Sequence, residues 1–252
     1  MRNLNYDFEI EKIVKFIKRQ LKNAGFKKII VGLSGGIDSS VTAALAVKAI
    51  GKENVFGVLL PYKTSHPDSL KHALVVAKLL EIEHRIIDIS PMVDAYFNSY
   101  EPEADFLRIG NRKARERMCV LYDLSAKKKA LVAGTGNLSE LMIGYCTQYG
   151  DGACAFETIG NLYKTEVFEI AGILGIPDEI INKNPTADLW EGQTDEDEMG
   201  ITYKELDEIL FQMLEEKKTD EQLIDSFGKE KIEKVKHMIK ISEFKRNVPP
   251  SP

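Results

Sequence analysis

A short apolar run that leads directly into a loop rich in glycine and serine constrains the fold of this chain most. Residues 28–33 (KIIVGL) are followed by Ser34-Gly35-Gly36-Ile37-Asp38-Ser39-Ser40 and by an alanine-rich segment that reaches residue 50. This pattern predicts a strand, a loop and a helix in immediate succession. The alternation continues with strands over 55–60, 84–89 and 131–133, and with helices over 67–80, after residue 90 and over 112–127. We therefore predict an α/β fold, a doubly wound parallel sheet with helices on both faces.

Both ends of the chain are predicted to be helical. Apolar residues recur at helical spacing over 6–23, and Gly25 follows where a left-handed cap would end a helix. After about residue 165 the pattern is helical again, with charged helices over 203–217 and 230–241 and a proline-rich tail over 249–252. Because no Ser/Gly/Pro-rich linker interrupts the chain, residues 1–252 are expected to form a single domain.

Composition excludes several classes of protein. The chain has 252 residues, 44% of them hydrophobic, and a formal net charge of -5, so it can bury a full core but has no overall basic field for nucleic acid. Its longest apolar stretch, over 40–50, is too short to span a membrane. Residues 1–11 lack the apolar region of a secretory signal, which favours the cytoplasm. The three cysteines, Cys119, Cys146 and Cys154, are expected to be buried thiols without a disulfide or zinc.

The loop after the first predicted strand has the chemistry of an anion site. In an open α/β sheet it lies at the carboxyl end of a strand and at the start of a helix, where backbone N–H groups and the helix dipole favour phosphate. Gly35 and Gly36 let the backbone close around oxygen atoms, and the neighbouring serines add hydroxyl donors. Asp38 fits beside phosphates if a divalent cation lies between them, so we predict that it binds Mg²⁺.

Other interpretations of the loop remain open at this point. It lacks the Gly-Lys-Ser/Thr of a Walker motif and the spacing of Gly-x-Gly-x-x-Gly. The segment Gly32-Leu33-Ser34-Gly35-Gly36 does satisfy the Gly-x-Ser-x-Gly pattern of a serine hydrolase with Ser34 as nucleophile, although none of the four histidines stands in a recognisable motif. A glycine turn capped by serine and aspartate is the purely structural alternative.

The segment from Ser34 to Ser39 resembles the pyrophosphate loop of N-type ATP pyrophosphatases, the adenine nucleotide alpha-hydrolase-like enzymes that adenylate a substrate. Within that group the chain is similar to the ammonia-dependent NAD synthetases. Further segments carry the resemblance in family order along nearly the whole chain: Gly110-Asn111, 114–118 (ARERM), 134–140 (GTGNLSE), 149–152 (YGDG), 162–167 (LYKTEV), 185–189 (PTADL), 193–196 (QTDE) and Lys245-Arg246.

The resemblance implies a set of site residues. ATP would be bound by Gly32, Leu33, Ser34, Gly35, Gly36, Ile37, Asp38, Ser39, Thr135, Lys164 and Thr186, with Asp38, Lys164 and Ser34 in catalytic roles and Mg²⁺ held by Asp38 and Glu140. The dinucleotide substrate would be bound by Arg115, Gln148, Ala155, Phe244 and Lys245. Taken singly, each has a plainer interpretation: Glu140 as a helix cap, Thr135 as a turn residue, Lys164 and Thr186 as surface groups, and Arg115 with Arg112, Lys113 and Arg117 as a solvated helix face.

The implied reaction joins ammonia to a carboxylate. In the family, the nicotinate carboxylate of deamido-NAD attacks the α-phosphate of ATP, and ammonia then displaces AMP from the acyl adenylate. A homodimer is implied as well. The chain shows no additional domain with a cysteine nucleophile, so free ammonia is the expected nitrogen donor, with a separate glutaminase as the alternative source.

Three positions depart from the family pattern: Gln148 stands where lysine is usual, Ala155 where aspartate is usual and Phe244 where histidine is usual. Nicotinate mononucleotide or another carboxylate is therefore an alternative acceptor, and a nucleotide-binding regulator without turnover is the alternative from another class. The polar segment over 185–200 fits a mobile loop that covers the substrate. We interpret its acidic run, residues 195–198 (DEDE), as the solvated start of a helix.

Overall fold

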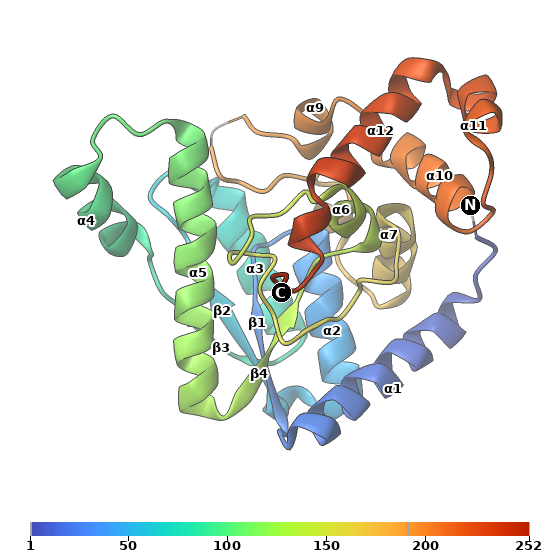
Figure 1. The fold of residues 1–252 in the computed structure, drawn as a ribbon. Helices are drawn as coiled ribbons and strands as arrows, with labels where there is room; N and C mark the ends of the chain where they lie inside the picture. The colour runs from blue at the N-terminus through green and yellow to red at the C-terminus, as the bar shows by residue number, and fades with distance from the viewer. Residues whose placement is uncertain (1, 191, 252) are drawn as a thin grey trace.

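The core of the protein is a sheet of five parallel strands. The structure is a computed structural model that describes residues 2–190 and 192–251, so residue 191 of the predicted mobile loop and residue 252 of the tail lie outside the described residues. The strands are β1 (Lys28–Gly32), β2 (Val55–Leu59), β3 (Glu83–Ile86), β4 (Ala130–Gly134) and β5 (Phe156–Glu157), in the order β3-β2-β1-β4-β5. Because β1 is the central strand, its carboxyl end lies at the middle of the row of strand ends, with β2 on one side and β4 on the other (Figure 1).

Helices cover both faces of this sheet. They are α1 (Tyr6–Ala24), α2 (Ile37–Ile50), α3 (Pro67–Leu79), α4 (Ser90–Tyr100), α5 (Phe106–Lys128), α6 (Leu138–Ile143), α7 (Lys164–Ile173), α8 (Asp178–Ile181), α9 (Asp195–Met199), α10 (Tyr203–Leu214), α11 (Asp220–Phe227) and α12 (Lys229–Ile241), with short 3-10 turns at Lys52–Asn54 and Glu243–Lys245. Successive side chains of β1 point to opposite faces of the sheet and pack against different helices. Ile29 and Val31 pack with α1, α2 and α7, whereas Ile30 packs with α4 and α5 on the other face.

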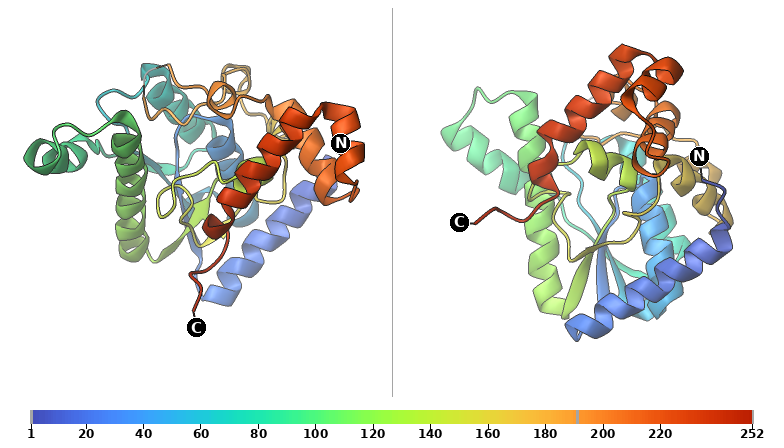
Figure 2. Two further views of the ribbon diagram at one scale, coloured as in Figure 1. Left: turned by 45° about the horizontal axis from the view of Figure 1, so that its top comes forward. Right: turned by 45° about the vertical axis from the view of Figure 1, so that its right-hand side comes forward.

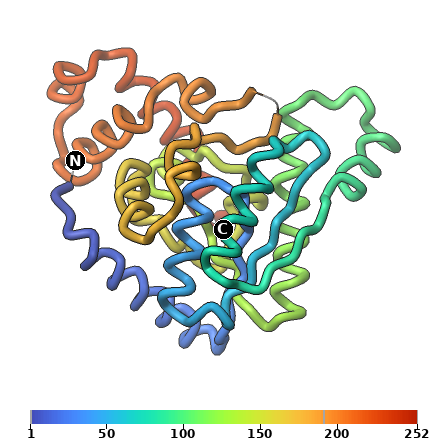
Figure 3. The backbone as a smooth tube through the Cα atoms, turned by 180° about the vertical axis from the view of Figure 1, so that it is seen from behind, coloured from blue at the N-terminus to red at the C-terminus, as the bar shows by residue number. Residues whose placement is uncertain are grey.

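The C-terminal helices form a third cluster beside the sheet. Leu206, Ile209 and Leu210 of α10 pack with Leu223 of α11 and Val235 of α12. In Figure 2 these helices gather at one corner of the molecule, next to the start of α1. Seen from behind in Figure 3, α1 runs along one side and the orange-to-red helices lie above its start. The predicted helical C-terminal part is confirmed.

The structure confirms the predicted doubly wound parallel sheet and corrects several details. Gly25 has a φ of 75° and caps α1 as expected. The helix predicted over 112–127 begins earlier, at Phe106, because Asp105 caps it by accepting a hydrogen bond from the N–H of Arg108. Strand β5 was not predicted, since two residues are too few to show an alternating pattern.

All three cysteines are free thiols in the structure, and the prediction that they are buried is wrong for Cys119, which is exposed on α5. Cys146 and Cys154 are only partly buried. Among residues 2–190 and 192–251, no helix is both long and apolar enough to cross a membrane.

Candidate active site

The loop between β1 and α2 is folded around its own serine hydroxyls. The hydroxyl of Ser39 donates to the carbonyl of Gly36 at 3.0 Å and accepts from the N–H of Ser34 at 3.3 Å. Gly35 has a φ of 78°, and a Cβ there would lie 2.1 Å from the carbonyl oxygen of Ser69. Only glycine fits this position, because both the left-handed backbone and the contact with α3 exclude a side chain. The helix start beyond it has no side-chain cap, so its N–H groups face the site.

Two carboxylates from different helices meet one buried lysine beside this loop. Asp38 is in the first turn of α2, Glu140 is on α6 and Lys164 is the first residue of α7. The Nζ of Lys164 lies 2.6 Å from Oδ2 of Asp38 and 3.1 Å from Oε1 of Glu140. The lysine side chain is only 2% exposed. Buried charges of this kind persist when they are paired, so the three groups form one electrostatic unit.

Neighbouring polar groups fix the positions of these three side chains. Asn137 caps α6 by accepting from the N–H of Glu140 and donates its Nδ2–H to Oδ1 of Asp38 at 2.9 Å. The N–H of Lys164 donates to the hydroxyl of Ser139 at 2.9 Å, and that hydroxyl donates in turn to the buried Asp207. The start of α7 is therefore held by α6 and α10, which places Lys164 against the end of β1.

Burial and nearby negative charge alter the acidity of Glu140. Loss of water, together with the carboxylates of Asp38 and Asp195, raises its pKa to about 7, although Lys164 acts in the opposite direction. Protonation of Glu140 near neutral pH would relieve repulsion within the cluster. A second cation would do the same, so the site has the charge to attract one.

Asp195 corrects the interpretation of the acidic run over 195–198. The run does begin a helix, α9, capped by Thr194, but Asp195 is only 4% exposed instead of solvated. Its carboxylate accepts hydrogen bonds from the hydroxyls of Tyr145 at 3.1 Å and Tyr203 at 2.9 Å. The Tyr203 hydroxyl also lies 3.1 Å from Oε1 of Glu140. One hydroxyl has one proton, so Tyr203 couples the two carboxylates, and packing against the tyrosines outweighs the local preference for solvent.

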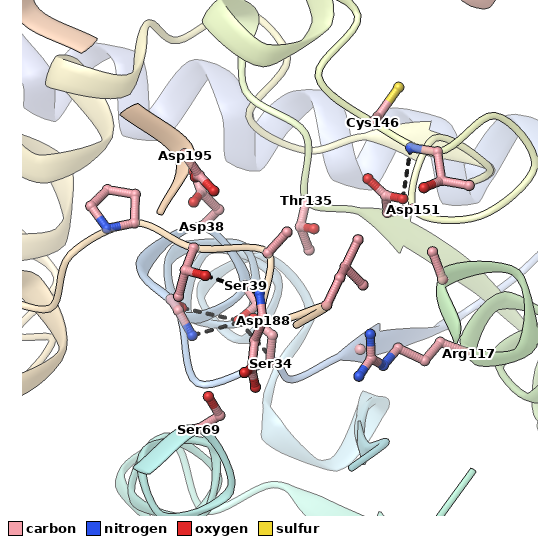
Figure 4. Close-up of a pocket in the computed structure, with 18 of the residues that line it drawn as sticks. Ser34, Asp38, Ser39, Ser69, Arg117, Thr135, Cys146, Asp151, Asp188 and Asp195 are labelled. Atoms are coloured by element: carbon pink, nitrogen blue, oxygen red, sulfur yellow. Dashed lines mark hydrogen bonds between the residues drawn. The ribbon is translucent and has the colours of Figure 1, made fainter. Parts of the chain in front are cut away.

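One end of a cavity of about 560 Å³, at the carboxyl ends of the strands, is lined by Asp38, Glu140, Lys164 and Asp195. Figure 4 shows Ser34, Asp38 and Ser39 on one side of the cavity, Thr135 near the middle, just after the end of β4, and Arg117 on the far side. Gly32, Leu33, Gly36, Ile37, Glu140, Lys164 and Thr186 also line the cavity. Beside Arg117 the far end is mainly apolar and is formed by Val58, Leu60, Met118 and Leu121, which pack together. A polar end beside an apolar end suits a ligand that joins phosphates to an aromatic base.

Not all of the predicted dinucleotide-binding residues line the cavity. Lys245 lines the cavity and donates to the carbonyls of Gly144 and Cys146, at 2.7 Å each. Arg115 donates from Nε to the carbonyl of Gln148 at 3.1 Å, outside the cavity lining. Ala155 and Phe244 are exposed, Phe244 by 57%, and neither lines the cavity. The structure therefore brings most of the predicted ATP residues together around the cavity, but it leaves four of the five predicted acceptor residues outside the cavity lining.

The solvated helix face proposed for α5 is wrong for two of its cations. Lys113 is 4% exposed and donates to the carbonyl of Leu189 at 2.7 Å. Arg117 donates from Nε to the carbonyl of Leu60 at 3.1 Å and lines the cavity. Lys183 also lines the cavity and was missed, because a lysine before an Asn-Pro step carries no local signal of a binding role.

The geometry argues against a serine hydrolase. Among the described residues, the hydrogen-bond partners of the Ser34 hydroxyl are Ser39 and the N–H of Gly36, and none is a histidine. A catalytic serine requires a base within hydrogen-bond reach. Ser34 is thus built into the loop as a structural and ligand-facing group.

The carboxylates suit a magnesium ion shared with phosphates better than a closed metal site. Across the described part of the chain, no group of three or more histidine, cysteine or acidic side chains could hold a metal by itself. Asp38 and Glu140 reach the same lysine nitrogen, so their oxygens converge on one small space. Magnesium usually takes one or two carboxylates and completes its shell with phosphate oxygens and water, and the donor set fits that chemistry.

The parallel sheet, the Gly/Ser loop at the end of its central strand and the carboxylate–lysine cluster define a nucleotide-binding protein of the adenine nucleotide alpha-hydrolase-like fold. A family model described as NAD synthase matches residues 9–249. This chain belongs to the NAD synthase family, whose members are ligases that form a C–N bond.

Curated relatives match nearly the whole chain. A protein of Fusobacterium nucleatum subsp. nucleatum named NH(3)-dependent NAD(+) synthetase is 49% identical over 98% of this chain and 96% of its own length. A protein of Methanocaldococcus jannaschii with the same name is 47% identical over 96% and 95%. The chain therefore spans almost the full length of these relatives.

Solved structures match the fold equally well. NH3-dependent NAD synthetase from Campylobacter jejuni, in complex with the nitrate ion, has a TM-score of 0.84 and is 35% identical, with 99% of each chain covered. NMN synthetase from Francisella tularensis has a TM-score of 0.87 and is 34% identical, also with 99% of each chain covered. These two structures are thus named after different products, NAD and NMN.

Proposed function

We propose that this chain catalyses the ATP-dependent amidation of deamido-NAD with ammonia, giving NAD, AMP and pyrophosphate. The observation that carries the proposal is the Ser34–Ser39 loop with Asp38, Glu140 and Lys164 converging beside it. Nearly full-length similarity to relatives named NH(3)-dependent NAD(+) synthetase supports the choice of reaction.

In this proposal the protein mainly positions its substrates and neutralises charge. The β- and γ-phosphates of ATP bind the N–H groups of the loop and the start of α2. The adenine base occupies the apolar end beside Leu60 and Met118. Asp38 and Glu140 would hold Mg²⁺, which supplies charge stabilisation on the phosphate oxygens when it is bound. Lys164 keeps those two carboxylates aligned and offsets their charge.

The two chemical steps then need no side-chain nucleophile. An oxygen of the nicotinate carboxylate forms a bond to the α-phosphorus, and the bond from that phosphorus to the bridging oxygen breaks, so that pyrophosphate leaves toward the loop. Ammonia then bonds to the activated carbonyl carbon, loses a proton and releases AMP. Binding both substrates in one cavity contributes mainly through proximity and preorganised charge.

The acceptor site and the assembly extend the proposal. Arg115, Gln148, Ala155, Phe244 and Lys245 would contact the dinucleotide at the edge of the cavity, where a homodimer would complete the site across its two-fold axis. An active monomer in sedimentation at assay concentration would contradict that assembly. We further propose that the enzyme works in the cytoplasm with free ammonia, while activity only with an added glutaminase would indicate delivery by a partner.

A second candidate acceptor is nicotinate mononucleotide. Two observations favour it: Gln148, Ala155 and Phe244 differ from the family pattern, and a solved structure described as NMN synthetase matches this chain with a TM-score of 0.87. We favour deamido-NAD because Arg115, Lys164, Thr186 and Lys245 are retained and because loss of a lysine and an aspartate together leaves the net charge unchanged.

The deciding experiment measures pyrophosphate release with ATP, Mg²⁺ and ammonia against a panel of acids, with both nucleotides competing in one reaction. A higher kcat/KM for deamido-NAD supports the proposed function. Preference for the mononucleotide overturns the acceptor but keeps the chemistry. ATP binding without turnover of any acid would instead indicate a nucleotide-binding regulator.

A further inference from the structure

Among the described residues, the positively charged side chains that line the cavity differ in the groups that they contact. Lys164 contacts two carboxylates, and Lys245 donates to two carbonyl oxygens. Arg117 is fixed by the carbonyl of Leu60 at the apolar end. By contrast, Lys183 donates to the hydroxyl of Ser69 at 3.1 Å, and among the described residues no carboxylate oxygen lies within 4.0 Å of its Nζ. Lys183 is thus a half-buried cation whose hydrogen-bond partner is a neutral hydroxyl, while Asp188 and Asp68 act on it only through their charges.

We propose that Lys183 is a further phosphate-binding residue, which contacts the terminal phosphates of ATP from the side of the loop opposite Lys164. The inference deepens the proposed function and rests on it. Nothing in the sequence around Lys183 indicates this role, which arises from the contact between two segments 114 residues apart.

The position of Ser69 places Lys183 next to the phosphate loop. The carbonyl oxygen of Ser69 lies 2.1 Å from where a Cβ of Gly35 would be, so the backbone of α3 touches the loop. In Figure 4, Ser69 and Asp38 lie on opposite sides of Ser34. Because the hydroxyl of Ser69 holds Lys183, the lysine approaches the loop from the α3 side, whereas Lys164 approaches through Asp38 on the other side.

The charge of the site requires such a cation. Asp38, Glu140 and Asp195 stand against the single charge of Lys164 in the cluster beside the loop. A magnesium ion would balance these carboxylates, but the triphosphate itself adds several negative charges. The start of α2 offsets only part of them, about half a charge for a helix dipole. Burial of Lys183 lowers its pKa, although the charges of Asp188 and Asp68 act in the opposite direction, and a phosphate would supply an anion in direct contact with the ammonium group.

Lys183 would also link ATP to the segment that follows it. Thr186 and Asp188, a few residues further on, line the same cavity. The carboxylate of Asp188 accepts from the N–H of His66 at 3.1 Å, which ties this segment to the chain just before α3. A phosphate bound by Lys183 would therefore hold the segment over the cavity.

The test compares binding of ATP and AMP to the full-length protein by calorimetry, with Mg²⁺ and without an acid acceptor. AMP lacks the β- and γ-phosphates, so a role at the terminal phosphates affects ATP alone. We expect Lys183→Met to weaken ATP binding by about tenfold or more and AMP binding by less than about twofold, and Lys183→Arg to retain most of the ATP affinity. The matched control is Lys71→Met, since Lys71 is an exposed lysine on α3 that pairs with Glu179 at 3.9 Å.

Two outcomes would overturn the role of Lys183. One is wild-type ATP affinity in Lys183→Met. The other is an equal loss of ATP and AMP affinity, which would mean that the lysine only supports the structure of the pocket. A thermal melt of each variant is measured alongside the titration to check that the variant is folded. A wild-type protein that binds ATP but amidates no acid would overturn the proposed function while this comparison of affinities still stands.

Discussion

Lys164 is the buried cation on which the carboxylate cluster depends, so its removal gives the most direct test of the site. Lys164→Met keeps most of the apolar length of the side chain and removes the charge. Asp38 and Glu140, at 2.6 and 3.1 Å from the lost nitrogen, are then left facing each other without a cation. The substitution therefore acts on charge more than on packing.

The expected loss of stability follows from the burial of the lysine. Breaking a buried ion pair by removing one partner costs about 3–5 kcal/mol. In a chain of this size each kcal/mol lowers Tm by about 2–4 °C, so Tm should fall by roughly 6–20 °C. Protonation of Glu140 offsets part of this loss, because the neutral acid no longer repels Asp38. The loss should thus be larger at pH 8 than at pH 6.

The assay is thermal and urea unfolding of Lys164→Met, Glu140→Gln and the double variant at both pH values. The double variant should be more stable than Lys164→Met at pH 8, because it leaves only one unpaired carboxylate. Adding Mg²⁺ should stabilise Lys164→Met more than the wild type. The control is Lys229→Met, an exposed lysine paired with the exposed Glu233 at 3.6 Å, with a change within about 0.5 kcal/mol. An unchanged Tm for Lys164→Met, or no rescue in the double variant, would refute the reasoning.

Four further predictions follow from the same cluster and its surroundings. Asp38→Asn should lower the rate of pyrophosphate release by about 10²-fold or more if Asp38 holds magnesium as proposed, since the substitution removes its charge. A near-wild-type rate would contradict that metal role. Because the pKa of Glu140 is raised to about 7, above its unfolded value, its contribution to stability is lost as pH rises from 4.5 through 7. Protons also compete with Mg²⁺ for this carboxylate, so half-maximal activity should need more Mg²⁺ at pH 6 than at pH 8. A Mg²⁺ requirement that does not change with pH would contradict this prediction. Tyr203→Phe should lower the free energy of unfolding by about 1–3 kcal/mol, as measured in urea, because the buried Asp195 loses a hydrogen-bond donor that it shares with Glu140. Gln148→Lys with Ala155→Asp should change the rate with deamido-NAD little; a large gain would mean that the acceptor site has changed specificity.

The sequence by itself determined the features that consecutive residues control. The run over 28–33, the loop from Ser34 to Ser39 and the alanine-rich helix follow one another along the chain, so their order and chemistry could be predicted together. Gly25 ends α1 because a glycine after an amphipathic helix adopts the left-handed conformation at low cost. The family resemblance added Glu140 and Lys164, which no local pattern singles out.

Only the tertiary structure decided which charges meet. Asp38 and Lys164 are 126 residues apart, and the crossovers of the sheet bring them to 2.6 Å. The run over 195–198 would be solvated on an isolated helix, but the hydroxyls of Tyr145 and Tyr203 supply hydrogen bonds that let Asp195 be buried. Lys183 gains its place beside the Ser34–Ser39 loop through Ser69 in the same way. Long-range packing sets the environment of each charge, because the cost of burying it depends on partners that the neighbouring sequence does not contain.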